Sequence, residues 1–139
     1  MVEAAVEGES GFEVSPMEIR RPGPSYTVDT LRALTRELPG RRLHFLMGAD
    51  QWQAFGGWRE PESIAELATL TVMARSGETP AEALPDLPEG CRPEVVTVDV
   101  TRVDVSATDI RRRIRRGRSV RYRVPEGAHR IIEREGLYR

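Results

Sequence analysis

The apolar positions along this chain follow two different spacings. Nearly continuous apolar runs at residues 42–48, 70–75 and 94–100 predict buried β-strands. Apolar residues spaced three and four apart predict amphipathic helices at residues 26–38, 60–70, 106–117 and 125–136. Because strands alternate with helices over most of the length, we expect a single domain, residues 1–139. Its fold class is α/β, with a mainly parallel sheet and flanking helices.

The remaining segments have weaker patterns. Residues 1–10 are interpreted as the tail of a helix that ends near Gly8, and residues 11–21 as a strand interrupted by Pro16. Residues 49–58 predict a short helix or turn that leads into a Gly-Gly loop. Residues 77–93 are rich in proline, glycine and acids, and a loop of that length is expected to be either functional or mobile.

Composition narrows the class of function. The 139 residues carry a net charge of −1, which argues against a chain that binds polyanions with its whole surface. A lone cysteine, Cys91, fits a reducing compartment. His44 and His129 lie far apart without a neighbouring cluster of ligands, so no metal site is predicted. With no apolar run of membrane-spanning length and no signal pattern, we expect a cytoplasmic chain without a membrane partner.

The segment in front of the arginines between Arg111 and Arg123 is the most informative. Ser106 follows a predicted strand, opens a predicted helix and has capping-box spacing to Asp109. A helix N-terminus after a parallel strand suits an anionic ligand, to which Thr108 could add a hydroxyl and Arg111 a charge. Three interpretations remain open. The residues could form a simple cap beside a solvated basic face, a phosphate site, or part of a nucleic-acid-binding segment.

The nucleic-acid interpretation is the weakest of these. The arginines after Arg111 are spread around the predicted helix and do not form one stripe. Tyr122 is the nearby aromatic side chain that could stack on a base, and no nucleic-acid recognition motif surrounds it. We therefore expect no nucleic-acid partner.

Four blocks of the sequence resemble, in order, the bacterial nicotinate-nucleotide adenylyltransferases. They are "EIRRPGPSYTVDTLRAL", "LHFLMGADQWQAFGGWRE", "LTVMARSG" and "VSATDIRRRIRRGRSVRYRVPEGAHRIIEREGLYR", and together they cover nearly the whole chain. The resemblance implies a Rossmann-like nucleotidyltransferase fold. It also implies transfer of AMP from ATP to nicotinate mononucleotide, which gives deamido-NAD and pyrophosphate in NAD biosynthesis. ATP, nicotinate mononucleotide and Mg²⁺ would be the partners, and the chain could form a homo-oligomer.

The resemblance also assigns roles to individual residues. Arg111 would be catalytic. The ATP-binding residues would be Ser106, Thr108, Arg111, Asp50 and Arg75, and the residues that bind nicotinate mononucleotide would be Thr27, Tyr26 and Trp58.

Four of these residues also have a structural interpretation. Asp50 could be a helix cap, Thr27 the N-cap of the following helix, and Arg75 an exposed strand end. Trp58 could be a core residue, although "FGGW" offers little regular structure for it to be core in.

One family motif, G-G-x-F-D-P-x-H-x-G-H, has no match in this sequence, and the strands around it would also be missing. We therefore expect the 139-residue chain by itself to fold poorly or aggregate and to be inactive. A misplaced start or a truncation of a longer enzyme would explain the difference. The alternative to an enzyme is a remnant that binds a nucleotide or a partner chain without catalysis, or that binds nucleic acid through Arg111 to Arg123.

Overall fold

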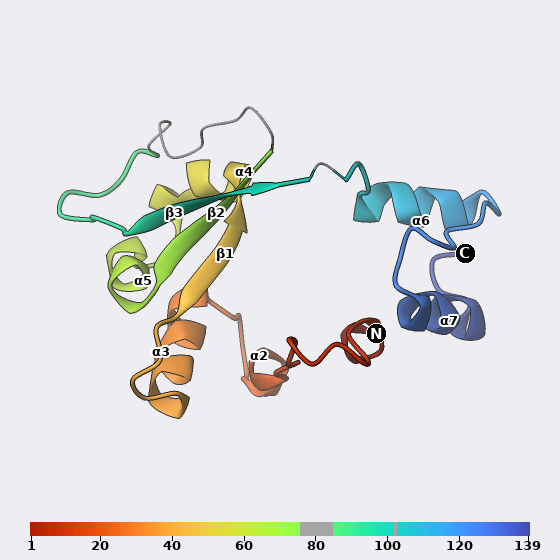
Figure 1. Ribbon diagram of the computed structural model, residues 1–139, viewed down its shortest axis with the longest axis horizontal. Helices are drawn as coiled ribbons and strands as arrows, with labels where there is room; N and C mark the ends of the chain where they lie inside the picture. Colours follow the sequence, from red (N-terminus) through yellow and green to blue (C-terminus); the bar gives the residue numbers. More distant parts are fainter. Residues whose placement is uncertain (76–84, 102) are drawn as a thin grey trace. The chain divides into compact units, whose positions relative to one another are not determined.

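The computed structural model describes residues 1–75, 85–101 and 103–139 (Figure 1). The chain divides into two compact units. One unit is formed by Met1–Pro16 together with Val103–Arg139, and the other by Met17–Arg102.

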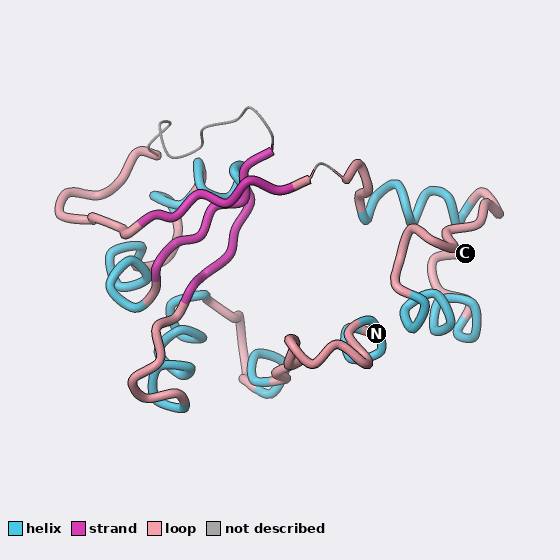
Figure 2. Tube along the Cα trace, in the orientation of Figure 1, coloured by secondary structure: helices cyan, strands magenta, loops and turns pink. Residues whose placement is uncertain are grey.

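The second unit is built on a parallel sheet. Its strands are β1 (His44–Gly48), β2 (Thr69–Arg75) and β3 (Val95–Val100), in the order β1-β2-β3 (Figure 2). The register aligns Leu46 with Thr71 and Thr71 with Val96. All three strands are the apolar runs that the sequence predicts, so the α/β class and the parallel sheet are confirmed.

One face of this sheet carries the core of the unit. Helices α3 (Thr27–Glu37), α4 (Ala49–Gln53) and α5 (Pro61–Leu67) pack there together with the short 3₁₀ helix η1 (Phe55–Gly57). Their fully buried side chains meet the sheet residues in one cluster, formed by Val28, Leu31, Met47, Trp52, Phe55, Ile64, Leu70 and Val72. Burial of a large apolar side chain contributes about 1.5–3 kcal/mol, so this cluster is the main source of stability of the unit.

The opposite face of the sheet is apolar, and the helices of the second unit do not cover it. Leu46 on β1 is 59% exposed, Met73 on β2 is 37% exposed, and Val96 and Val98 on β3 are 39% and 41% exposed. The strand register places these four side chains on the same face, because residues aligned across a parallel sheet point the same way. The helices of the core cluster all lie on the other face.

The first unit is helical. It contains α1 (Val2–Ala5), α6 (Ala107–Arg115) and α7 (Glu126–Glu135). Helix α7 ends at Gly136 in the left-handed conformation, as the sequence predicts. Its Gly127 lies against the backbone of α1, since a Cβ there would come within 1.8 Å of the Ala4 carbonyl oxygen. Within the described residues, no helix is long and apolar enough to cross a membrane.

The prediction for residues 11–21 is wrong. Residues 12–16 have no regular structure, and Met17–Arg20 form a single-turn helix, α2. Alternation of apolar residues gives a strand only where a neighbouring strand accepts its backbone hydrogen bonds. Pro16 also removes one donor. Glu18 on α2 instead accepts a hydrogen bond from the Thr30 hydroxyl of α3, at 2.5 Å.

Candidate functional site

The two segments that are predicted to bind nicotinate mononucleotide lie next to each other. Tyr26 and Thr27 open α3, and Trp58 and Arg59 follow η1. The guanidinium carbon of Arg59 lies 4.4 Å from the ring centroid of Tyr26, which is cation–π geometry. Through this contact the structure brings Tyr26 and Thr27 close to Trp58, as the resemblance implies. Thr27 is the first helical residue, so its interpretation as the N-cap is wrong, because Tyr26 occupies that position without a side-chain cap.

Trp58 is more closely packed than its Gly-rich context suggests. Its ring is half-buried against the core cluster. It meets Phe45 edge-on at 5.8 Å and Phe55 in a tilted arrangement at 5.7 Å between centroids. Aromatic contacts of this kind contribute about 0.5–1.5 kcal/mol each beyond area burial. The indole is thus fixed by one part of its surface while another part remains accessible.

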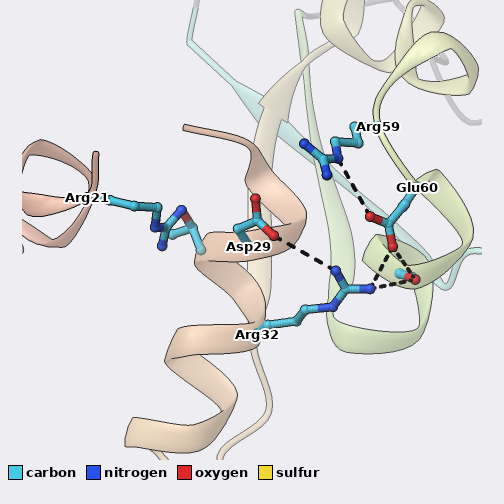
Figure 3. A network of polar contacts seen from close by, with 7 residues as sticks. Arg21, Asp29, Arg32, Arg59 and Glu60 are labelled. Carbon is cyan, nitrogen blue, oxygen red and sulfur yellow. Dashed lines mark hydrogen bonds and ion pairs between the residues drawn. The ribbon is translucent and has the colours of Figure 1, made fainter. Parts of the chain in front are cut away.

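A polar network ties α3 to the start of α5 (Figure 3). The Arg32 guanidinium donates to Glu60 Oε2 at 2.6 Å and to the Ser63 hydroxyl at 3.3 Å, and it also lies 3.8 Å from Asp29. The hydrogen bond from Arg32 holds the pKa of the Glu60 carboxyl below its ordinary value. Glu60 itself has the left-handed conformation, with φ of 52°. This strained residue makes the turn from Trp58 into α5.

Asp50 lies just after β1, in the first turn of α4, and is exposed. Its interpretation as a helix cap is wrong, because Gly48 is the N-cap residue. The carboxylate instead folds back over Gly48, where a Cβ would meet Asp50 Oδ1 at 2.8 Å. The carboxyl end of a strand in a parallel sheet is where α/β proteins place ligands, and Asp50 can accept hydrogen bonds from hydroxyls there.

Arg75 ends β2 at the same edge of the sheet, but its side chain lies outside the described part of the structure. The same holds for most of the predicted long loop, since residues 77–84 are not described. The described end of that loop, from residue 85, reaches η1, because the Asp86 carbonyl would lie 1.8 Å from a Cβ on Gly56.

The other predicted group sits on α6, in the first unit. Ser106 is the N-cap, and its hydroxyl accepts a hydrogen bond from the Asp109 N–H at 3.1 Å, which confirms the predicted cap. Thr108 is exposed, and Arg111 lies one turn in, with Nη2 3.5 Å from the Thr108 hydroxyl. Such a helix terminus presents backbone N–H groups and positive potential to an anion.

Several arginines of the basic segment have partners within the first unit. Arg112 and Arg123 both pair with Asp109, and Arg113 donates to the Ser119 carbonyl oxygen. Tyr122 is 89% exposed, and its ring lies under Arg121. Three of the arginines therefore have partners in the chain itself, and a nucleic-acid ligand is not needed to explain their positions.

No group of three or more metal-ligating side chains occurs among the described residues. An open hollow of about 300 Å³ lies at the opposite, amino-terminal edge of the sheet, where Leu43, Thr69 and Glu94 precede or begin the strands. Thr69 donates its hydroxyl hydrogen to Glu94 there at 3.1 Å, and none of the predicted site residues lines the hollow.

Comparison of the sequence with known proteins identifies the family of this chain. A family profile described as cytidylyltransferase-like matches residues 1–113. The chain is 47% identical over 135 residues to a probable nicotinate-nucleotide adenylyltransferase of Thermus thermophilus, with 97% of this chain and 68% of that protein covered. The chain belongs to the nicotinate-nucleotide adenylyltransferase family.

Other members of the adenylyltransferase family are similarly close to this chain in sequence. A probable nicotinate-nucleotide adenylyltransferase of Thermomicrobium roseum is 42% identical over all of this chain, which spans 65% of that protein. This chain therefore spans about two thirds of the length of these relatives. Among solved structures, Plasmodium falciparum nicotinic acid mononucleotide adenylyltransferase complexed with APC superposes with a TM-score of 0.62 at 13% identity. That likeness covers 84% of this chain and 60% of the other, and it shows the fold.

Sequence reasoning missed three residues that lie beside the segments predicted to bind nicotinate mononucleotide: Arg32, Arg59 and Glu60. Arg59 could have been found, because it directly follows the Trp that the adenylyltransferase family resemblance singles out. The Arg32–Glu60 pair joins residues 28 positions apart, and a pairing across that distance leaves no pattern in one sequence.

Proposed function

We propose that this chain is part of an enzyme that transfers AMP from ATP to nicotinate mononucleotide. A phosphate oxygen of the mononucleotide would attack the α-phosphorus of ATP. The bond from that phosphorus to the bridging oxygen would break, so that deamido-NAD forms and pyrophosphate leaves. Such a reaction needs positioning and stabilisation of phosphate charge and no covalent enzyme intermediate.

The observation that best supports the proposal is the contact of the Arg59 guanidinium with the Tyr26 ring, because these two residues directly follow Trp58 and precede Thr27 in the sequence. A half-buried indole fixed by Phe45 and Phe55 is a rigid platform on which a flat pyridine ring can stack. The Thr27 hydroxyl at the start of α3 would lie near the ring substituent. This half of the site would hold nicotinate mononucleotide.

The residues proposed to bind ATP belong to both units, and each set is described by itself. The N-terminus of α6 offers the Ser106 and Thr108 hydroxyls and the Arg111 guanidinium to phosphates. Asp50 would accept hydrogen bonds from a ribose hydroxyl, and Arg75 would contact the nucleotide. Arg111 would stabilise charge on the transferred phosphoryl group.

Mg²⁺ would enter with ATP. It is held largely by substrate phosphates and its own waters in sites of this kind, so a dedicated cage of protein ligands is not required. The described residues contain no group of three or more His, Cys, Asp or Glu side chains that could hold a metal ion.

A chimera tests the proposal. This chain would replace the matched segment of the Thermus thermophilus relative, and deamido-NAD would be measured by chromatography after incubation with MgATP and nicotinate mononucleotide. We expect product formation that falls at least tenfold with Trp58→Ala and with Arg111→Ala, and that is unchanged with Arg115→Ala. A folded chimera that makes no deamido-NAD would overturn the proposal.

A further inference from the structure

The segment that follows α6 returns along the helix toward its N-terminus. The Arg118 N–H donates to the Arg113 carbonyl oxygen at 2.9 Å, and the Arg113 guanidinium donates to the Ser119 carbonyl oxygen at 3.3 Å. These bonds fasten the turn to the end of α6. The chain then runs back far enough for the Arg123 guanidinium to lie 3.9 Å from the Asp109 carboxylate, in the first turn of α6. All of these residues belong to the same unit.

Asp109 holds Arg123 near the start of α6 without occupying its donors. One carboxylate oxygen of Asp109, Oδ1, accepts a hydrogen bond from Arg112 at 2.5 Å. The other, Oδ2, is 3.9 Å from Arg123 Nη1, which is beyond hydrogen-bonding distance. Within the described residues the Arg123 guanidinium has no hydrogen-bond acceptor, and its side chain is 41% exposed. Its N–H donors are therefore available to a ligand.

Arg111 and Arg123 reach the N-terminus of α6 from neighbouring sides. Arg111 lies over Thr108, with Nη2 3.5 Å from the hydroxyl, whereas Arg123 lies beside Asp109. Consecutive residues of an α-helix are about 100° apart around its axis, so the two guanidinium groups flank the start of the helix. A single phosphate bound there needs only one of them. A chain of phosphates is longer and can contact both.

We propose that Arg123 is a further ATP-binding residue, which holds the β- and γ-phosphates that leave as pyrophosphate. The inference rests on the proposed function, in which Arg111 stabilises charge on the transferred α-phosphoryl group. A guanidinium binds two phosphate oxygens at once through parallel N–H donors. AMP would then be held by Arg111 alone and ATP by both arginines, so Arg123 would make the site prefer the triphosphate.

The test is a binding measurement on the full chain. ATP and AMP are titrated separately, at one Mg²⁺ concentration, into the wild type, Arg123→Gln and Arg123→Lys by calorimetry. We expect Arg123→Gln to lose about tenfold in affinity for ATP, equivalent to about 1.4 kcal/mol, and less than about twofold for AMP. Arg123→Lys keeps the positive charge and should retain part of the preference for ATP.

Arg115→Gln is the matched control, because Arg115 is exposed in the last turn of α6 and its loss changes the net charge equally. Its affinities for ATP and AMP should equal those of the wild type. An unchanged affinity for ATP in Arg123→Gln would overturn the inference and leave the proposed function standing. Equal losses for ATP and AMP would also overturn it, since a residue that only supports the helix through Asp109 gives that result. Failure of the wild type to bind ATP would overturn both.

Discussion

Gly56 in η1 and Asp86 are in backbone contact, and a Cβ on Gly56 would come within 1.8 Å of the Asp86 carbonyl oxygen. The contact holds the segment that enters β3 against the turn that presents Trp58. Because the obstacle is backbone and not a flexible side chain, it cannot move aside without displacing the segment.

We therefore expect Gly56→Ala to lower the free energy of unfolding by about 1–3 kcal/mol, the usual cost of overpacking, and to weaken binding of the mononucleotide at Trp58. Gly57→Ala is the matched control, since nothing lies within 4 Å of a Cβ there. Urea unfolding followed by tryptophan fluorescence measures both variants. Equal free energies of unfolding for Gly56→Ala and Gly57→Ala would contradict the prediction that Gly56 is in close contact with Asp86.

Gly127 has the same relationship to Ala4 in the other unit. Gly127→Ala should separate α1 from α7, so amide hydrogens of Val2–Ala5 would exchange with solvent faster while those of α6 keep their protection. Gly11→Ala serves as the control, because a Cβ at that position meets nothing. Unchanged exchange in α1 would show that the two helices are not in close contact.

Ser106 allows capping to be separated from phosphate binding. Ser106→Ala should lose about 1 kcal/mol of stability together with ATP affinity. Ser106→Asp should keep the cap, because aspartate is an equally good N-cap residue, and yet weaken ATP binding at least tenfold through repulsion between the carboxylate and the phosphates. Arg115→Ala should change neither quantity. If Ser106→Asp binds ATP as the wild type does, Ser106 acts as a cap alone.

The Arg32–Glu60 pair predicts a response to acid. The pKa of Glu60 is lowered in the folded chain, mainly by the hydrogen bond from Arg32. Its contribution to stability is therefore present above the ordinary carboxyl pKa and is lost as the pH falls through the lowered value. Glu60→Gln should be less stable than the wild type at neutral pH, with the difference vanishing in acid. Thermal melts at a series of pH values measure it, and a difference that persists at low pH would contradict the prediction.

Cys91 predicts a response to alkali. It is a buried core residue, and burial raises the pKa of its thiol, with a smaller contribution from the charge of Glu62. The unfolded chain therefore releases this proton at a lower pH than the folded chain, so stability should fall as the pH rises through the ordinary thiol range and above it. Cys91→Ala should remove that fall. Slow alkylation of the folded wild type at about pH 8 would agree, whereas fast alkylation would not.

The sequence was sufficient to predict the elements whose signal is local. The strands at Leu46, Val72 and Val96 are apolar runs, and the ends of α6 and α7 follow from Ser106 and Gly136. These features depend on side chains within a few positions of each other, which a single sequence displays directly.

What could not be predicted depends on partners distant in the sequence. The alternation around Val14 gave no strand, because no neighbouring strand pairs with it in the described sheet. The packing of Trp58 depends on Phe45, thirteen residues earlier, and the role of Glu60 depends on Arg32. The helix caps at Thr27 and Asp50 were each misplaced, since cap boundaries shift by one or two residues without changing the apolar pattern.

The open face of the sheet, with Leu46, Met73, Val96 and Val98, has a consequence for the chain inside a cell. Parallel sheets are ordinarily covered on both sides, and an apolar face that the helices of its own unit leave uncovered is a surface that chaperones bind and proteases reach. We expect the yield of soluble chain to level off as expression rises. Polar replacements at Leu46 and Val98 should increase the maximum soluble yield, and they should leave the packing around Trp58 on the other face unchanged.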